Sequence, residues 1–86
     1  MPKISEFFGI SICMYYREHM PPHFHAIYAG DEALISIDDL SVLSGEIPPR
    51  ALGLVMEWAN LHRAELHRVW NQAMAHQPLD SIEPLK

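Results

Sequence analysis

The chain has 86 residues, 49% of them hydrophobic and 20% charged, which is typical of one small globular domain. Eleven acidic against six basic residues give a net charge of −5 with neutral histidines, which argues against nucleic-acid binding through overall electrostatic attraction. One cysteine, Cys13, excludes an internal disulfide and a thiolate zinc cluster. We find no signal-peptide pattern and no apolar segment long enough to cross a bilayer, so we expect a cytoplasmic protein.

The first part of the chain, residues 1–45, is expected to be mainly β structure. Loose alternation of apolar and polar residues over 4–16 predicts a strand, or two short strands that meet at Gly9. A hairpin follows, with strands over 23–28 and 33–38. We therefore predict a small antiparallel sheet of three to four strands.

The hairpin pattern also predicts a register. A turn centred at 30–31 places Phe24 opposite Ile37 on the face that we expect to be buried. The same register places His23 opposite Asp38 on the outer face. A shift by one residue would mix apolar and polar residues on both faces, which favours this pairing.

The second part of the chain predicts one long amphipathic helix over 48–76. Such a helix is about 42 Å long, whereas a domain of this size is only about 30 Å across. Two alternatives follow: the helix bends near 63–64, or it overhangs and exposes Val69, Trp70 and Met74. An overhang would suit a partner or self-association surface.

The complete prediction is a single domain, 1–86, of the α+β class. A sheet of three to four strands packs on one long C-terminal helix, which is continuous or bent. Residues 77–86 form a C-terminal tail or an edge strand, although Pro84 argues against the strand.

The most unusual segment contains two histidines two residues apart. In a strand, His23 and His25 project from one face, and the predicted register adds Asp38 to them. Two imidazoles and a carboxylate can ligate a divalent metal ion, and the histidines can also serve as a catalytic acid and base. The alternative is that both histidines cover a solvated sheet face while Asp38 caps a turn.

Four further residues are candidates for binding. Arg17 and Arg50 can bind an anion, and Trp70 belongs to the surface that an overhanging helix would expose. His62 lies in the apolar stripe of the helix, where it is either a hydrogen-bonded core histidine or, if a bulge near Pro22 reversed the strand, a third metal ligand. We expect any metal site to use the outer hairpin face and to leave out His62.

Several blocks in order along nearly the whole chain carry a more specific signal. They are M-P-x-I-S-x-F-x-G-I at the start, M-Y-Y at 14–16, P-P-H-F-H at 21–25, I-P-P-R-A-L at 47–52, E-W-A-x-L-H-R at 57–63 and I-E-P-L at 82–85. Together they resemble the bacterial domain-of-unknown-function 4160 (DUF4160) family. The resemblance implies a small stand-alone protein whose gene often neighbours one of the DUF2442 family, and therefore a two-gene module of toxin–antitoxin type. It implies no established activity, but His23, His25, Arg50 and His62 fall in its blocks.

Two functions fit these observations. The first is a protein-binding component that pairs with a small cognate protein of the DUF2442 type or with itself. The second is a hydrolase or ribonuclease-like toxin that uses His23 and His25, with or without a divalent metal ion, although the negative charge counts against RNA as substrate.

Overall fold

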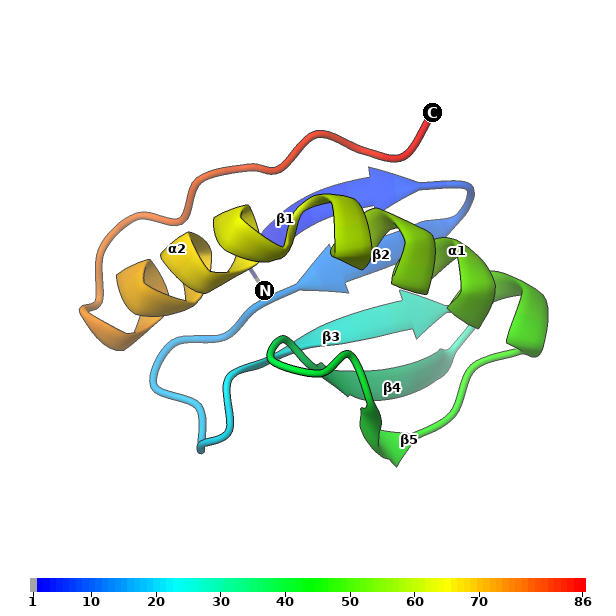
Figure 1. The fold of residues 1–86 in the computed structure, drawn as a ribbon, viewed down its shortest axis with the longest axis horizontal. Helices are drawn as coiled ribbons and strands as arrows, with labels where there is room; N and C mark the ends of the chain where they lie inside the picture. Colours follow the sequence, from blue (N-terminus) through cyan, green and yellow to red (C-terminus); the bar gives the residue numbers. More distant parts are fainter. Residues whose placement is uncertain (1) are drawn as a thin grey trace.

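The computed structural model describes residues 2–86, which form a five-stranded antiparallel sheet followed by two helices (Figure 1). The strands are adjacent in chain order, and the elements are β1 (Lys3–Phe7), β2 (Ile10–Cys13), β3 (His23–Tyr28), β4 (Asp31–Ser36), β5 (Val42–Gly45), α1 (Pro49–Leu61) and α2 (Arg63–Met74). The predicted α+β class with an antiparallel sheet is confirmed. The segment 4–16 forms two strands that meet at Gly9, as one of the two alternatives predicted, but the predicted number of strands is wrong because the segment after β4 adds a fifth.

The β3–β4 hairpin turns at 29–30, where both residues have positive φ, as in the two-residue turns that match the twist of a hairpin. The predicted turn at 30–31 is therefore wrong by one residue, which changes the cross-strand pairing by two. His23 lies opposite Ser36 rather than Asp38. Because a change of two residues preserves the alternation of faces, Phe24 still points into the core.

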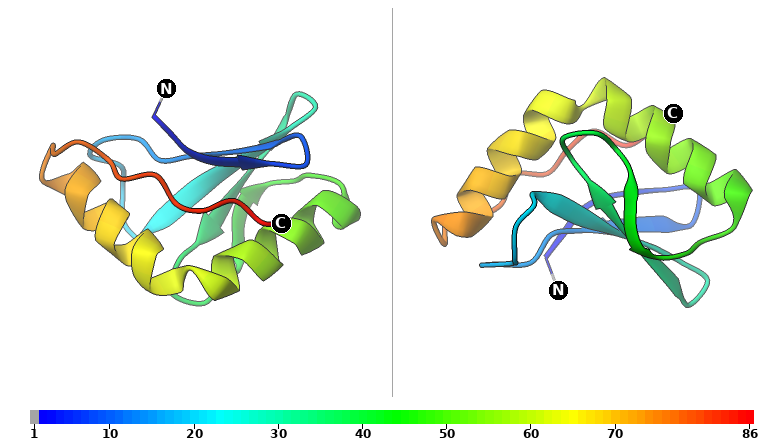
Figure 2. Two further views of the ribbon diagram at one scale, coloured as in Figure 1. Left: turned by 90° about the horizontal axis from the view of Figure 1, so that it is seen from above. Right: turned by 60° about the horizontal axis from the view of Figure 1, so that its bottom comes forward.

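The two helices pack on one face of the sheet (Figure 2). Trp58 of α1 is fully buried in the core between them. Its indole lies 5.4 Å from the ring of Phe7 and 5.8 Å from the ring of Phe24, measured between centroids. The indole N–H donates a hydrogen bond to the carbonyl oxygen of Glu83. One fully buried side chain thus connects the sheet, the first helix and the C-terminal tail.

The predicted long helix is two pieces that meet at His62, whose backbone leaves the helical conformation. The bend lies next to the expected position, 63–64. Because the chain turns there, α2 folds back over the sheet within a molecule whose longest dimension is 33 Å. Val69 and Trp70 are buried as a result, so the predicted overhang is wrong.

Residues 77–86 form an extended tail rather than an edge strand. The tail lies beside β1 (Figure 2), where the N–H of Ile82 donates to the carbonyl oxygen of Ile4 at 2.8 Å. The Ile82 side chain is buried in the core.

In the described part of the chain, none of the helices combines the length and the apolar character that a membrane span requires.

Pairing of β5 depends on Gly45, which has positive φ and whose missing side chain leaves room for the carbonyl oxygen of Glu32. We expect Gly45→Ala to lower the free energy of unfolding by about 1–3 kcal/mol more than Gly30→Ala. Gly30 is a matched control because it shares the positive φ but has open space around it. Urea denaturation of both variants tests this, and equal losses would show that the contact with Glu32 does not matter.

Candidate metal centre

The candidate site lies at the start of β3, on the face of the strand that alternates with Phe24, and Trp70 of α2 packs against His23 at this end of the sheet. His23 and His25 project from this face, as the strand alternation predicts. The segment between β2 and β3 brings Glu18 against them. The histidines are only 5% and 8% exposed, so the alternative in which they cover a solvated face is wrong.

His23 has one ring nitrogen engaged and one without a partner. Its Nδ1 lies 2.8 Å from the carbonyl oxygen of Pro21, which can only accept, so Nδ1 carries the proton. The Nε2 atom is buried and, among residues 2–86, has no hydrogen-bond partner. The nearest oxygen of Glu18 is 3.8 Å away, beyond hydrogen-bond length. A buried polar atom in this state needs an explanation.

His25 lies between two carboxylates. Its Nδ1 is 2.7 Å from Glu32 Oε2, and its Nε2 is 2.7 Å from Glu18 Oε1. When Nδ1 donates to Glu32, the lone pair of Nε2 faces an oxygen that also carries lone pairs. Two such atoms at this distance require a proton or a metal cation between them.

The three side chains together have the form of a metal site. One ligand atom from each of Glu18, His23 and His25 can be chosen so that all lie within 4.8 Å of one another. Tetrahedral Zn²⁺ at about 2.0–2.1 Å from its ligands holds neighbouring ligand atoms about 3.3 Å apart. The two distances from Glu18 Oε1 to the imidazoles, 2.7 and 3.8 Å, lie on either side of that value. Two of the three ligand separations therefore lie within about 0.6 Å of the tetrahedral value, and the third is below 4.8 Å.

Both imidazoles also have the outer hydrogen bonds that orient metal-bound histidines. Such ligands usually donate their other ring N–H to a carboxylate or a backbone carbonyl, which sets the tautomer and the ring orientation. Glu32 has this role for His25, and the carbonyl of Pro21 has it for His23. The arrangement leaves both Nε2 atoms as the ligand atoms.

Aromatic rings surround the histidines and limit the access of water. The ring centroid of Tyr15 lies 4.4 Å from that of His25, with the two ring planes nearly perpendicular, and the ring centroid of Trp70 of α2 lies 5.4 Å from that of His23. Burial raises the pKa of Tyr15, and negative charge at Cys13, Glu32 and Glu18 raises it further. Burial also raises the pKa of the Cys13 thiol, which therefore stays protonated at neutral pH.

Asp38, predicted as the third ligand, does not lie with the two histidines. Its carboxylate is 3.3 Å from Nε2 of His67 on α2. The physical reason is the tighter hairpin turn, which places Ser36 opposite His23 and carries Asp38 beyond the end of β4. Glu18 takes the position that the sequence analysis assigned to Asp38.

The other predicted binding residues do not join this cluster. His62 lies at the break between the helices, where its Nδ1 is 2.6 Å from Glu65 Oε1. Arg17 is exposed in the segment before β3, with positive φ. Arg50 is exposed on α1. Trp70 is buried, so it supports the ring of His23 rather than a surface for partners.

Sequence reasoning missed Glu18 and Glu32. Glu32 lies on the same face as His25, diagonally across the hairpin, and a two-residue turn at 29–30 would have predicted this. Glu18 lies outside any strand or helix, so no periodic pattern predicts its position. The signal available for it was an acidic residue shortly before the P-P-H-F-H block.

Comparison with known proteins gives one match. No curated protein and no solved structure matches the chain. A family model described as "Domain of unknown function (DUF4160)" matches residues 9–71, a span that includes the whole candidate metal centre. The resemblance found in the sequence blocks is thereby confirmed, and the chain belongs to the DUF4160 family.

Proposed function

We propose that this protein binds a divalent metal ion through Glu18, His23 and His25, and that the bound metal activates a water molecule for hydrolysis. One observation carries the proposal. Both imidazoles have Nδ1 occupied by an oxygen acceptor, while their Nε2 atoms converge on one carboxylate. A purely structural pair of buried histidines gains nothing from leaving the Nε2 of His23 without a partner.

The ligand set favours zinc and leaves coordination positions free. Catalytic Zn²⁺ sites typically have three protein ligands, two histidines and a glutamate among them, with water at the fourth position. Metal coordination lowers the pKa of such a water to about 7, which supplies hydroxide near neutral pH. The side chain of Glu18 is 25% exposed, whereas that of His23 is 6% exposed, so water and substrate reach the centre from the Glu18 side.

The burial of His23 argues against the metal-free alternative, in which the two histidines act directly as acid and base. A general base must come within hydrogen-bond reach of the substrate. The Nε2 of His23 has almost no accessible surface, so a substrate atom cannot reach it. A metal ion bound between the imidazoles and Glu18 would lie nearer to the solvent than this nitrogen.

The protein-binding role in a two-gene module stays a prediction from the family resemblance. The geometry of the metal centre does not bear on it.

The first prediction concerns metal affinity. We expect His23→Ala, His25→Ala and Glu18→Gln each to weaken Zn²⁺ binding by about 100-fold or more, because each removes a ligand. Glu32→Ala should weaken it by about 10–100-fold through loss of the hydrogen bond that orients His25. Calorimetric titration with a competing chelator measures these affinities. His67→Ala is the matched control, and an equal loss in that variant would contradict the assignment.

The second prediction separates a functional from a structural role for His23. In the presence of a chelator, we expect His23→Phe to change the free energy of unfolding by less than about 1 kcal/mol. The substitution keeps a ring beside Trp70 and removes the buried Nε2 that lacks a partner. The neighbouring Phe24→Ala should cost about 3–5 kcal/mol by comparison. A similarly large loss in His23→Phe would indicate that His23 serves stability.

The third prediction concerns chemistry. We expect the zinc-loaded protein to hydrolyse p-nitrophenyl acetate or bis(p-nitrophenyl) phosphate about 100-fold faster than the same concentration of free zinc. Glu18→Gln and a chelator should both abolish this rate, and zinc-loaded His67→Ala should retain it. Tight zinc binding without hydrolysis of either ester would contradict the hydrolytic part of the proposal and leave the metal centre standing.

A further inference from the structure

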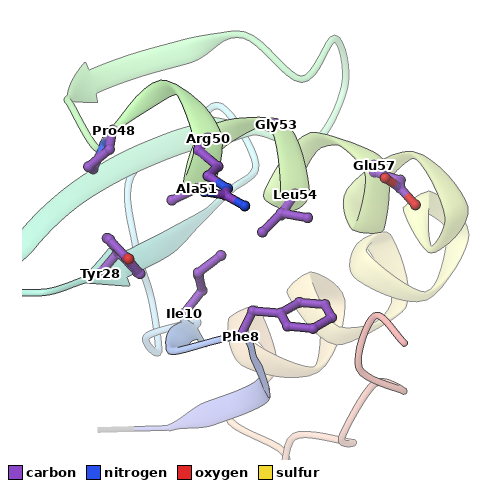
Figure 3. Close-up of a pocket in the computed structure, with 9 residues that line it drawn as sticks. All are labelled: Phe8, Ile10, Tyr28, Pro48, Arg50, Ala51, Gly53, Leu54 and Glu57. Atoms are coloured by element: carbon purple, nitrogen blue, oxygen red, sulfur yellow. The ribbon is translucent and has the colours of Figure 1, made fainter.

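A second surface, separate from the metal centre, has features that the fold itself does not explain. An open pocket of ≈ 810 Å³ lies between the first half of α1, the β1–β2 turn and the end of β3 (Figure 3). Phe8, Ile10 and Tyr28 form its sheet side, and Leu54 lies on its helix side. Phe8 is 60% exposed, an unusual state for an aromatic side chain that has no role in the core.

The helix wall of this pocket is a single face of α1. Arg50, Leu54 and Glu57 are spaced by four and three residues, and Gly53 lies three residues after Arg50 and four before Glu57, so all four lie on one face of the helix and border the pocket (Figure 3). Leu61 continues the same face and is 65% exposed. We call these five residues the α1 stripe.

Gly53 is the first unexplained feature of the α1 stripe. Glycine in a helix interior costs roughly 0.5–1 kcal/mol relative to alanine. Its φ is not positive, and a Cβ atom built there would meet no other atom within 4 Å. Within residues 2–86, neither backbone geometry nor packing therefore requires a glycine. A residue without a side chain does allow another backbone to approach the helix closely.

The charges of the α1 stripe are the second feature. Arg50 and Glu57 have opposite charges and lie two helical turns apart, with Gly53 and Leu54 midway between them. Among residues 2–86, neither lies within salt-bridge distance of an opposite charge; other exposed pairs, such as Lys3 with Glu6, do.

We infer that this protein forms a symmetric dimer in which α1 packs antiparallel against α1 of a second copy. A two-fold axis between Gly53 and Leu54 brings Arg50 of each copy opposite Glu57 of the other. Two-fold interfaces are self-complementary in this way, because each contact occurs twice. The stripe is thus complementary to itself in charge, and Gly53 lets the two helices approach at the centre.

Apolar side chains supply the rest of the contact: Phe8 is exposed, and Leu54 is half-buried. Leu54 of each copy lies near the axis, and Phe8 borders the helix of its own copy, where the second helix would cover it. The surface consists of one helix face and one turn, so it is smaller than a typical obligate interface. We therefore expect a dissociation constant in the micromolar range.

The test is sedimentation equilibrium of the full chain between 1 and 300 μM. We expect a dimer for the unmodified protein and at least tenfold weaker association for Arg50→Glu and for Glu57→Arg, because each places like charges opposite one another. The double variant, Arg50→Glu with Glu57→Arg, restores opposite charges and should dimerise within about threefold of the unmodified protein. Arg63→Glu is the matched control for a charge change outside the stripe.

A second variant tests the close approach. Gly53→Leu should abolish dimerisation and leave the monomer folded by circular dichroism, because its side chain would extend into open space in the monomer. A monomeric unmodified protein at 300 μM would overturn the inference. So would a dimer that both single charge variants leave unchanged, or a double variant that fails to restore association. Zinc affinity is independent of all these outcomes, so failure here leaves the proposed metal centre standing.

Discussion

The alternation of side chains along β3 is the constraint on which the core and the candidate site both depend. Phe24 points toward the helices and contacts Trp58, while His23 and His25 must point the other way. The position of Phe24 in the core therefore determines where both imidazoles emerge. Any slip of β3 by one residue would bury the imidazoles beneath Trp58 and expose Phe24, so the packing of the core protects the geometry of the site.

The candidate metal centre contains a feature that lowers the stability of the fold, as functional sites often do. Within residues 2–86, the buried Nε2 of His23 has no hydrogen-bond partner, whereas both ring nitrogens of His25 contact carboxylates. An apolar residue at position 23 would avoid the buried, unpaired nitrogen. The surroundings make this arrangement tolerable: Tyr15 and Trp70 hold the rings, and the carbonyl of Pro21 and the carboxylate of Glu32 set their tautomers. Metal binding would give the Nε2 of His23 the partner that it lacks.

The features that follow from periodicity were predictable, and those that depend on turns were not. The burial of Phe24 and the shared outer face of His23 and His25 come from alternation, which survives a register error of two residues. Helix length showed that a straight helix must either bend or overhang, but it did not decide between these two, because the choice depends on the burial of Val69 and Trp70 against the sheet. Asp38 was misplaced because the sequence at 29–30 is Ala-Gly, which lacks the usual signature of a two-residue turn.

The two inferred surfaces are compatible because β3 separates them along its length. His23 and His25 lie at its first residues, whereas Tyr28, at its other end, borders the pocket beside α1. Five residues of extended chain correspond to about 16 Å. Dimerisation through α1 would therefore leave the solvent-facing side of each metal centre, next to Glu18, open to substrate. A symmetric dimer would then carry two independent centres, one at the far end of each copy, and neither copy would complete the site of the other.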